Sequence, residues 1–473
     1  MSVPSAVSFL LNDRVVTSDA HAATPVLDLL RGPFGQKATK EGCREGDCGA
    51  CTVLLGNVRD GRLVYRAVTS CLLPLGEVAG QHIVTVEGLL GTANAPTPVQ
   101  SALVAELGTQ CGFCTPGIVM ALTGFLLQAP HLSDDEAKLA LAGNICRCTG
   151  YAPIVRAAAA LAQQHAHLLT QDIDRVPGLI ATGTLPAYFV DVPQRLQRLH
   201  PLPRLLALPP GARILAGATD LLVQGPHGLL EQDVVLAAQL VDDDVTLAND
   251  DLLIGAGVTM QQLAHHPLFL PFVPDMPEFA RLIASQQIRE RATLAGNLVN
   301  ASPIGDFAIL LLALGASAQL QGPDGLREVP LAEFYLGYKK LDLRPGEWLT
   351  ALRVPENARG KHVAFAKVSK RTHLDIASVN SALWLDVQDG IIAHARLSAG
   401  GVAAVPKWLR NASEALRGLP VNGETARLAG QLARAEIAPI SDVRGSALYK
   451  SRLLERQIFA HFDRLFGVLE GVP

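Results

Sequence analysis

The sequence predicts a multidomain α+β protein, and three observations lead to this prediction. The chain has 473 residues, which is too long for one compact core and corresponds to about three domains. All eight cysteines lie before residue 149 and form two groups of four with different spacing. From Tyr188 onward, short strand-like segments alternate with helical ones, and cysteine is absent.

The composition excludes several classes of protein. Hydrophobic residues make up 49% and charged residues 18% of the chain, with a net charge of −4. This charge balance gives no electrostatic attraction toward nucleic acid or an anionic membrane. The longest apolar run, 307–318, is shorter than the roughly 18 residues of a membrane helix, and the N-terminus has no basic leader. We therefore expect a cytoplasmic protein with no membrane or nucleic-acid partner, in which clustered cysteines bind metal or perform redox chemistry.

The first cysteine group lies in the stretch EGCREGDCGACTV. Its x4–x2 spacing, with a fourth cysteine twenty residues further on, is typical of a plant-type [2Fe–2S] ferredoxin. Three glycines in the loop would let the backbone fold tightly around a small cluster. A four-cysteine zinc site is the alternative, although zinc motifs usually pair short knuckles. The predicted ligands are Cys43, Cys48, Cys51 and Cys71.

Short β-rich segments surround this loop. Strands are expected within 6–13, 51–56, 62–70 and 82–89, and a short helix is expected within 25–32 before a glycine stop. Together they predict a β-grasp ferredoxin domain over residues 1–90.

The second cysteine group has a different spacing and a helical setting. A helix is expected over 118–127 with proline in its first turn, a second one after the N-cap Ser133, and a third over 154–164. Both cysteine pairs are expected at helix N-termini, where the helix dipole favours thiolates. Residues 91–165 are thus predicted to be an all-α domain with a second four-thiolate site. Its ligands are Cys111, Cys114, Cys146 and Cys148.

A polar stretch containing glycine and proline follows, and residues 166–182 are predicted to be a domain linker. His165 and His167 lie beside it at the end of a helix. We expect them to be a solvated pair rather than metal ligands.

Two later segments could hold a phosphate-bearing cofactor in a mixed α/β domain. In the first, an apolar run at 214–216 turns through small residues into a helical stretch at 221–224. Such a helix N-terminus receives a pyrophosphate well, although the absence of GxGxxG does not support a Rossmann fold. The second is a loop-rich stretch at 293–306 that precedes an apolar helix at 307–316. Its hydroxyl and amide groups suit phosphate and ribityl hydroxyls, and a polar surface loop is the alternative.

The cysteine motifs also resemble a known family. CREGDCGAC followed by CGFCTPG and CRCTGY closely resembles the iron–sulfur region of the xanthine dehydrogenase (molybdenum hydroxylase) family. The resemblance implies two [2Fe–2S] clusters, the second in a four-helix bundle, and all eight ligands carry over. Asp47 stands where many relatives have glycine, at a loop position that is not a ligand.

The resemblance extends over nearly the whole chain. It implies an α/β FAD-binding domain over 183–357 and an α+β flavoprotein C-terminal domain over 358–473. Ile283 takes the place of a phenylalanine that lies near the flavin ring in vertebrate relatives. The predicted FAD contacts are Ile214, Leu215, Ala216, Gly217, Ala218, Thr219, Asp220, Leu221, Ile283, Thr293, Gly296, Asn297, Ser302, Asp306, Leu349 and Lys367.

A flavin can accept single electrons and pass on a hydride, which makes it the adapter between clusters and nicotinamide. The resemblance therefore implies an electron-transfer subunit of a bacterial-type xanthine dehydrogenase, with NAD as acceptor. The chain ends at Pro473, where single-chain members continue into a molybdenum-cofactor domain. We expect a large partner subunit that holds molybdopterin and oxidises hypoxanthine and xanthine to urate, in an α2β2 heterotetramer. On this chain we expect no catalytic residue beyond the cofactors.

Three alternatives stay open. The chain could serve another molybdenum hydroxylase that acts on aldehydes or N-heterocycles, and the substrate cannot be read from this chain. Carbon monoxide dehydrogenases and 4-hydroxybenzoyl-CoA reductases usually place clusters and flavin on separate chains, so the fusion argues against them. A stand-alone redox sensor and a zinc-stabilised structural protein are the other two.

Overall fold

The computed structural model describes residues 6–90, 95–168 and 174–468. The chain forms two compact units. The first comprises Met1–Leu205, Gly211–Gln239 and Ser285–Arg291, and the second comprises Leu206–Pro210, Leu240–Ala284 and Ala292–Pro473. Helix α12 (Gln286–Arg289) thus belongs to the first unit although its neighbours in sequence belong to the second. None of the helices in the described ranges combines the length and apolar character that a membrane span requires.

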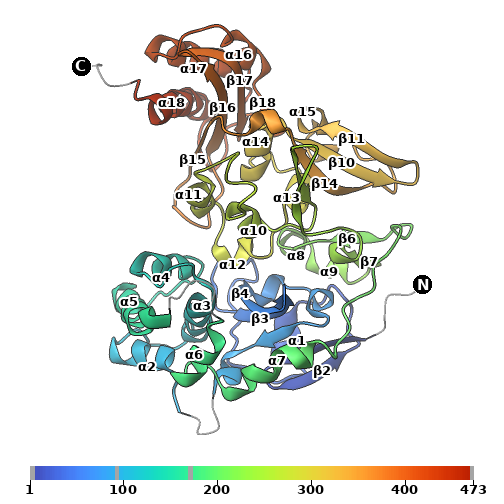
Figure 1. The fold of residues 1–473 in the computed structure, drawn as a ribbon, viewed down its shortest axis with the longest axis vertical. Helices are drawn as coiled ribbons and strands as arrows, with labels where there is room; N and C mark the ends of the chain where they lie inside the picture. The colour runs from blue at the N-terminus through green and yellow to red at the C-terminus, as the bar shows by residue number, and fades with distance from the viewer. Residues whose placement is uncertain (1–5, 91–94, 169–173, 469–473) are drawn as a thin grey trace. The chain divides into compact units, whose positions relative to one another are not determined.

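A five-stranded sheet opens the first unit, in the order β2-β1-β5-β3-β4. Its strands β2, β3 and β4 are labelled in Figure 1. β1 pairs in parallel with β5, and the other neighbours are antiparallel, which is the β-grasp arrangement. The four expected strands and the expected helix are confirmed. β2 was not predicted because it is an exposed edge strand without an apolar face. The elements are β1 (Val7–Leu11), β2 (Arg14–Ser18), α1 (Val26–Arg31), β3 (Thr52–Arg59), β4 (Arg62–Thr69) and β5 (His82–Val84).

Four helices follow and pack around a shared apolar core. The expected helices are confirmed, including proline in the first turn of two of them and Ser133 as an N-cap that accepts from the Glu136 N–H. α3 also packs on β3 and β4, so this bundle and the sheet share one core. The helices are α2 (Pro98–Ala105), α3 (Thr115–Gln128), α4 (Asp134–Ala140) and α5 (Ala152–His165).

The stretch predicted as a linker contains α6 (Val176–Ala181), while its residues 169–173 lie outside the described residues. The predicted solvated histidine pair is wrong for His165, which is fully buried. Its Nδ1 lies 2.9 Å from the Leu161 carbonyl oxygen and its Nε2 3.1 Å from Thr184 Oγ1. Thr184 comes from beyond α6, so the linker folds back onto the helical core. Burial lowers the pKa of His165, which keeps the ring neutral.

The rest of the first unit is a small parallel pair of strands with two helices between them. α7 (Val192–Leu196) precedes it, and β6 and β7 pair side by side. The apolar run predicted as a strand and the helical stretch after it are both confirmed. These elements are β6 (Arg213–Leu215), α8 (Leu221–Gln224), α9 (Pro226–Leu229) and β7 (Val234–Leu236).

The second unit begins with an antiparallel sheet in the order β11-β10-β14-β9-β8. Its strands are β8 (Val245–Ala248), β9 (Asp251–Gly255), β10 (Ser317–Gly322), β11 (Gly325–Pro330) and β14 (Trp348–Val354), with a hairpin β12 (Tyr335–Gly337) and β13 (Lys340–Leu341). Its helices are α10 (Met260–Ala264), α11 (Met276–Arg281), α13 (Leu294–Val299), α14 (Asp306–Ala313) and α15 (Leu331–Phe334). The apolar helix predicted at 307–316 is thus present but ends earlier.

A second antiparallel sheet, β15-β16-β17-β18, completes this unit. Two long amphipathic helices, α17 and α18, pack together and bury their apolar faces in its core. The strands are β15 (His362–Val368), β16 (Val379–Gln388), β17 (Ile391–Gly400) and β18 (Lys407–Trp408), and the helices are α16 (Arg410–Ala415), α17 (Gly423–Ala435) and α18 (Ala447–Phe466).

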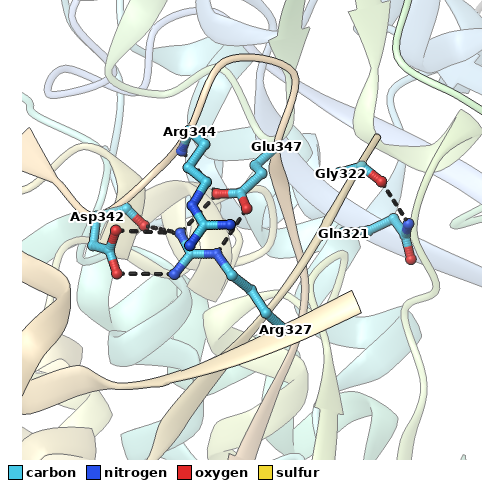
Figure 2. Close-up of polar contacts among 6 residues, drawn as sticks. All are labelled: Gln321, Gly322, Arg327, Asp342, Arg344 and Glu347. Carbon is cyan, nitrogen blue, oxygen red and sulfur yellow. Dashed lines mark hydrogen bonds and ion pairs between the residues drawn. The ribbon is translucent and has the colours of Figure 1, made fainter. Parts of the chain in front are cut away.

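An arginine on β11 holds the loop between β13 and β14 in place (Figure 2). Arg327 Nε donates to Glu347 Oε1 at 2.7 Å, and its Nη1 donates to Asp342 Oδ2 at 2.9 Å. The Arg344 N–H donates to Glu347 Oε2 at 2.7 Å. One guanidinium therefore binds two carboxylates in a forked geometry that lysine could not reproduce.

This cluster predicts a pH-dependent contribution to stability. The hydrogen bond from Arg327 lowers the pKa of Glu347 from 4.5 to about 2. Because the folded-state pKa is the lower one, the stabilisation is complete above pH 4.5 and is lost as the pH falls through about 2. Glu347→Gln should therefore lower the urea unfolding midpoint at pH 7, and the difference from wild type should shrink between pH 4.5 and 2. The exposed Glu333 on α15 is the control, and Glu333→Gln showing the same pH profile would contradict this assignment.

Candidate functional site

The first cysteine group is assembled by the β3–β4 hairpin. Cys51 immediately precedes β3, and Cys71 lies in the short helical turn just after β4. The strand register pairs Thr52 with Thr69, so the two thiols meet although twenty residues separate them. The Ser70 N–H donates to the Cys51 carbonyl oxygen at 3.2 Å and locks this end of the hairpin. Both thiols are buried.

The other two thiols of this group lie in the loop before Cys51. Cys43 and Cys48 are hydrogen bonded to each other, as are Cys51 and Cys71. Cys43 Sγ also accepts from the N–H groups of Glu45 at 3.3 Å and Cys48 at 3.4 Å. The contact with Cys48, followed by these N–H donors, lowers the pKa of Cys43 to about 5. The same contact raises the pKa of Cys48, and the two backbone N–H donors favour the thiolate form of Cys43 within the pair.

Glycine is required at two positions of this loop because a cysteine sulfur or a neighbouring side chain lies close to the Cα atom. A Cβ at Gly42 would lie 2.7 Å from Cys48 Sγ. Gly46 has a φ of +78°, and a Cβ there would lie 2.5 Å from the Ile288 side chain. The loop therefore has no space for a side chain at Gly42 or Gly46.

The second cysteine group lies in two loops of the helical region. Cys114 is the N-cap residue of α3, as predicted. Cys146 and Cys148 precede α5, which begins at Ala152, two residues earlier than expected. They lie in the preceding loop, where the Tyr151 hydroxyl accepts from the Cys146 N–H at 3.1 Å.

The four thiols of this group also form two pairs. Cys148 Sγ and Cys111 Sγ are 3.4 Å apart, and Cys114 is hydrogen bonded to Cys146. Burial and contact with Cys146 raise the pKa of Cys114 to about 12. Among the described residues, no three or more His, Cys, Asp or Glu side chains converge on a single metal position. Two thiol pairs per group match a two-iron cluster, in which each iron takes two cysteines, better than one zinc with four ligands.

The two cysteine groups are joined by a short bridge of hydrogen bonds. The Ile145 N–H donates to the Cys48 carbonyl oxygen at 2.9 Å, directly before Cys146 in the chain. Asn144 Nδ2 donates to the Gly49 carbonyl oxygen at 3.0 Å. A Cβ at Gly49 would collide with the Gly143 carbonyl oxygen. The cysteine motifs alone did not reveal this bridge. The sequence signal that could have indicated it is Asn144, an amide side chain two residues before Cys146.

The two groups differ in exposure. Cys111 and Cys148 are exposed, whereas Cys51 and Cys71 are buried. The exposed thiols share their loops with exposed apolar side chains, namely Phe113, Ile145 and Tyr151. The second group is therefore the more exposed of the two, although Cys146 is buried and Cys43 and Cys48 in the first group are half-buried.

The first predicted flavin segment lies in the first unit, next to the first cysteine group. Leu215 belongs to the same apolar cluster as Cys51 and Cys71. The turn after it carries Ala218 at a φ of +57°, an unusual conformation for alanine. The Gly217 carbonyl oxygen accepts from Arg291 Nη2 at 3.3 Å. A tight turn that follows the buried Leu215, the last residue of β6, thus lies beside the first cysteine group.

The second predicted flavin segment lies in the second unit and is partly helical. The prediction of a loop is wrong for 294–299, which form α13, because Thr293 caps it by accepting from the Gly296 N–H at 3.1 Å and because Leu294 and Leu298 are buried. Asn297 Oδ1 is buried without a hydrogen-bond partner among the described residues. Such an orphaned acceptor fits a ligand hydroxyl or amide.

Asp306 and Lys367, which the resemblance implied as FAD contacts, form a buried ion pair. Lys367 Nζ lies 2.8 Å from Asp306 Oδ2, and Asn380 Nδ2 donates to Asp306 Oδ1 at 2.6 Å. The side chain of Lys367 is 2% exposed and that of Asp306 11%. Asn380 was missed because nothing in the sequence around it indicates a site. Ile283 and Leu349 are buried in this unit.

Family models match most of the chain. A [2Fe-2S] binding domain matches residues 85–159 and the FAD binding domain in molybdopterin dehydrogenase matches 192–357. The CO dehydrogenase flavoprotein C-terminal domain matches 364–465.

Relatives in sequence and structure agree with these matches. Xanthine dehydrogenase 1 of Arabidopsis thaliana is 28% identical over 95% of this chain, and human aldehyde oxidase is 27% identical over 99%. The chain spans only 39% and 40% of the length of these two proteins. A chain of a solved Cu,Mo-CO dehydrogenase is 30% identical, with a TM-score of 0.51, over 54% of this chain and 90% of that one. A chain of quinoline 2-oxidoreductase from Pseudomonas putida 86 is 27% identical, with a TM-score of 0.50, over 54% of this chain and 90% of that one.

Proposed function

This chain belongs to the molybdenum hydroxylase family, and from that premise we propose that it is the electron-transfer subunit of an NAD-dependent xanthine dehydrogenase. Its cofactors would be two [2Fe–2S] clusters and FAD. Its partner would be a large molybdopterin subunit that oxidises hypoxanthine and xanthine to urate, in a cytoplasmic α2β2 heterotetramer. The likeness to a plant xanthine dehydrogenase over 95% of the chain supports this choice of substrate.

The observation that carries the proposal is the arrangement of eight thiols as four contacting pairs in two groups that share a backbone hydrogen bond. When bound, [2Fe–2S] clusters supply one-electron transfer, and FAD links single-electron to hydride transfer. The residues of this chain would hold the thiolates, and they bury Cys51 and Cys71 in the first group. The bridge from Cys48 to Ile145 keeps the two groups adjacent. Adjacent sites with different exposure suit electron transfer from a surface toward the interior.

The exposed second group would face the molybdenum partner. Cys111 and Cys148 are exposed, and apolar side chains around them would become buried when a partner docks. FAD contacts are proposed for the segment 214–221 and, separately, for Thr293, Gly296, Asn297, Ser302, Asp306, Lys367, Leu349 and Ile283. The proposed domain boundaries are those expected from the sequence.

A second candidate function is the same role for another molybdenum hydroxylase. The likeness to an aldehyde oxidase and to a chain of quinoline 2-oxidoreductase favours it. Co-purification of the partner, followed by anaerobic assays with xanthine, an aldehyde, quinoline or carbon monoxide, separates the two. NADH formation with xanthine supports the first proposal, and reduction by one of the other substrates alone refutes it.

The purified chain should contain about four iron atoms and about one FAD, because each thiol group matches a two-iron cluster. Iron and zinc are measured by elemental analysis and FAD by release and fluorescence. About two irons, or zinc in a stoichiometric amount, would contradict the two-cluster assignment.

A further inference from the structure

The bridge between the two cysteine groups depends on a residue from a distant part of the chain. Gln287 lies on α12, which belongs to the first unit. Its side chain is 1% exposed. Its Nε2 donates to the Ala140 carbonyl oxygen at 3.2 Å and to Asn144 Oδ1 at 2.9 Å. Both amide hydrogens are therefore used, and one of them satisfies a carbonyl at the C-terminal end of α4 that the helix leaves without a partner.

Asn144 links Gln287 to the first cysteine group through two hydrogen bonds. It accepts from Gln287 and donates to the Gly49 carbonyl oxygen, between Cys48 and Cys51. The next residue, Ile145, donates its N–H to Cys48. One buried amide thus fixes a turn that touches both ligand loops.

The turn at Gly143 is packed tightly against the segment that carries Gln287. A Cβ at Gly143 would collide with Gln287 Oε1 and would lie 2.9 Å from Ser285 Cβ. Gly46, in the first ligand loop, is in turn packed against Ile288, the next residue on α12. The segment 285–291 therefore contacts both cysteine loops and limits their relative movement.

We infer that Gln287 is a positioning residue that fixes the separation of the two iron–sulfur sites. This inference rests on the proposed function, since it presupposes two clusters. Gln287 itself touches no thiol, and it acts through Asn144 and the backbone of the two loops. A role in packing alone would require only the volume of the side chain, whereas positioning requires its two N–H donors.

The test uses Gln287→Met in the holoprotein, because methionine keeps the length of the side chain and has no donor. Both reduced clusters are monitored by electron paramagnetic resonance, and their magnetic interaction is measured as a splitting. Both individual signals and the iron content should persist, while the splitting is lost because the separation becomes variable. Asn144→Ala removes the same link from the other side and should have the same effect.

Gln239→Met is the matched control. Gln239 is similarly buried in the same unit, and its side chain accepts from the Leu236 N–H and donates to the Pro203 carbonyl oxygen, neither of which belongs to a ligand loop. It should retain the wild-type splitting. A wild-type splitting in Gln287→Met and Asn144→Ala would overturn the inference, as would its loss in Gln239→Met. A wild-type protein with fewer than two cluster signals would instead overturn the proposed function.

Discussion

Replacing Cys43 by alanine is expected to abolish one of two iron–sulfur signals and to remove about half of the iron, while the second signal is kept. Cys43 is paired with Cys48 and receives two backbone N–H donors, so its loss leaves one iron of the first site without a ligand. Cys148→Ala should remove the other signal, because its thiol lies against Cys111 in the second group. Electron paramagnetic resonance of the dithionite-reduced variants, together with iron analysis, measures both effects.

These two cysteines are the best choice because neither is deeply buried, so alanine leaves no large cavity. Glu45→Ala is the control. Its side chain is exposed in the same loop, and its N–H to Cys43 is kept. It should retain both signals. If Cys43→Ala and Cys148→Ala lost the same signal, the division of the thiols into two groups would be wrong.

Asp306→Ala is expected to destabilise the second unit by about 3–5 kcal/mol, because it leaves the buried ammonium of Lys367 without its counter-charge. The ammonium lies 2.8 Å from the carboxylate, and Asn380 Nδ2 would also lose one of its two acceptors. Urea unfolding followed by circular dichroism measures the change. FAD content is measured in parallel, since the sequence also predicts that Asp306 contacts the flavin.

The charge argument has a direct test in the double variant Asp306→Ala with Lys367→Met. It leaves no buried charge and should recover much of the lost stability, which a simple loss of contacts would not allow. Asp386→Ala is the matched control, because Asp386 on β16 pairs with Lys361, which lies just before β15 and whose side chain is 32% exposed. Asp386→Ala should lower the free energy of unfolding by less than about 1 kcal/mol. Equal destabilisation by Asp386→Ala and Asp306→Ala would contradict this reading of the pair.

The sequence by itself determined the elements and the chemistry of the thiols. Alternating apolar residues, prolines in first turns and the Ser133 cap are local signals, so β1, β3, α3 and α4 could be predicted from neighbouring residues alone. Cysteine spacing likewise separates two groups, because ligands within one loop must lie close together. An edge strand such as β2 escaped this reasoning, since it buries no apolar face.

Only the tertiary structure decided which groups meet across long sequence separations. The pairing of Cys51 with Cys71 follows from the β3–β4 register, and that of Lys367 with Asp306 from the packing of α14 on the sheet that contains β15. Gln287 joins the cysteine loops because α12 packs in the first unit. Such contacts depend on the burial of whole elements rather than on residues nearby in sequence, and hydrogen bonding in a buried site is satisfied by whichever group the packing brings there.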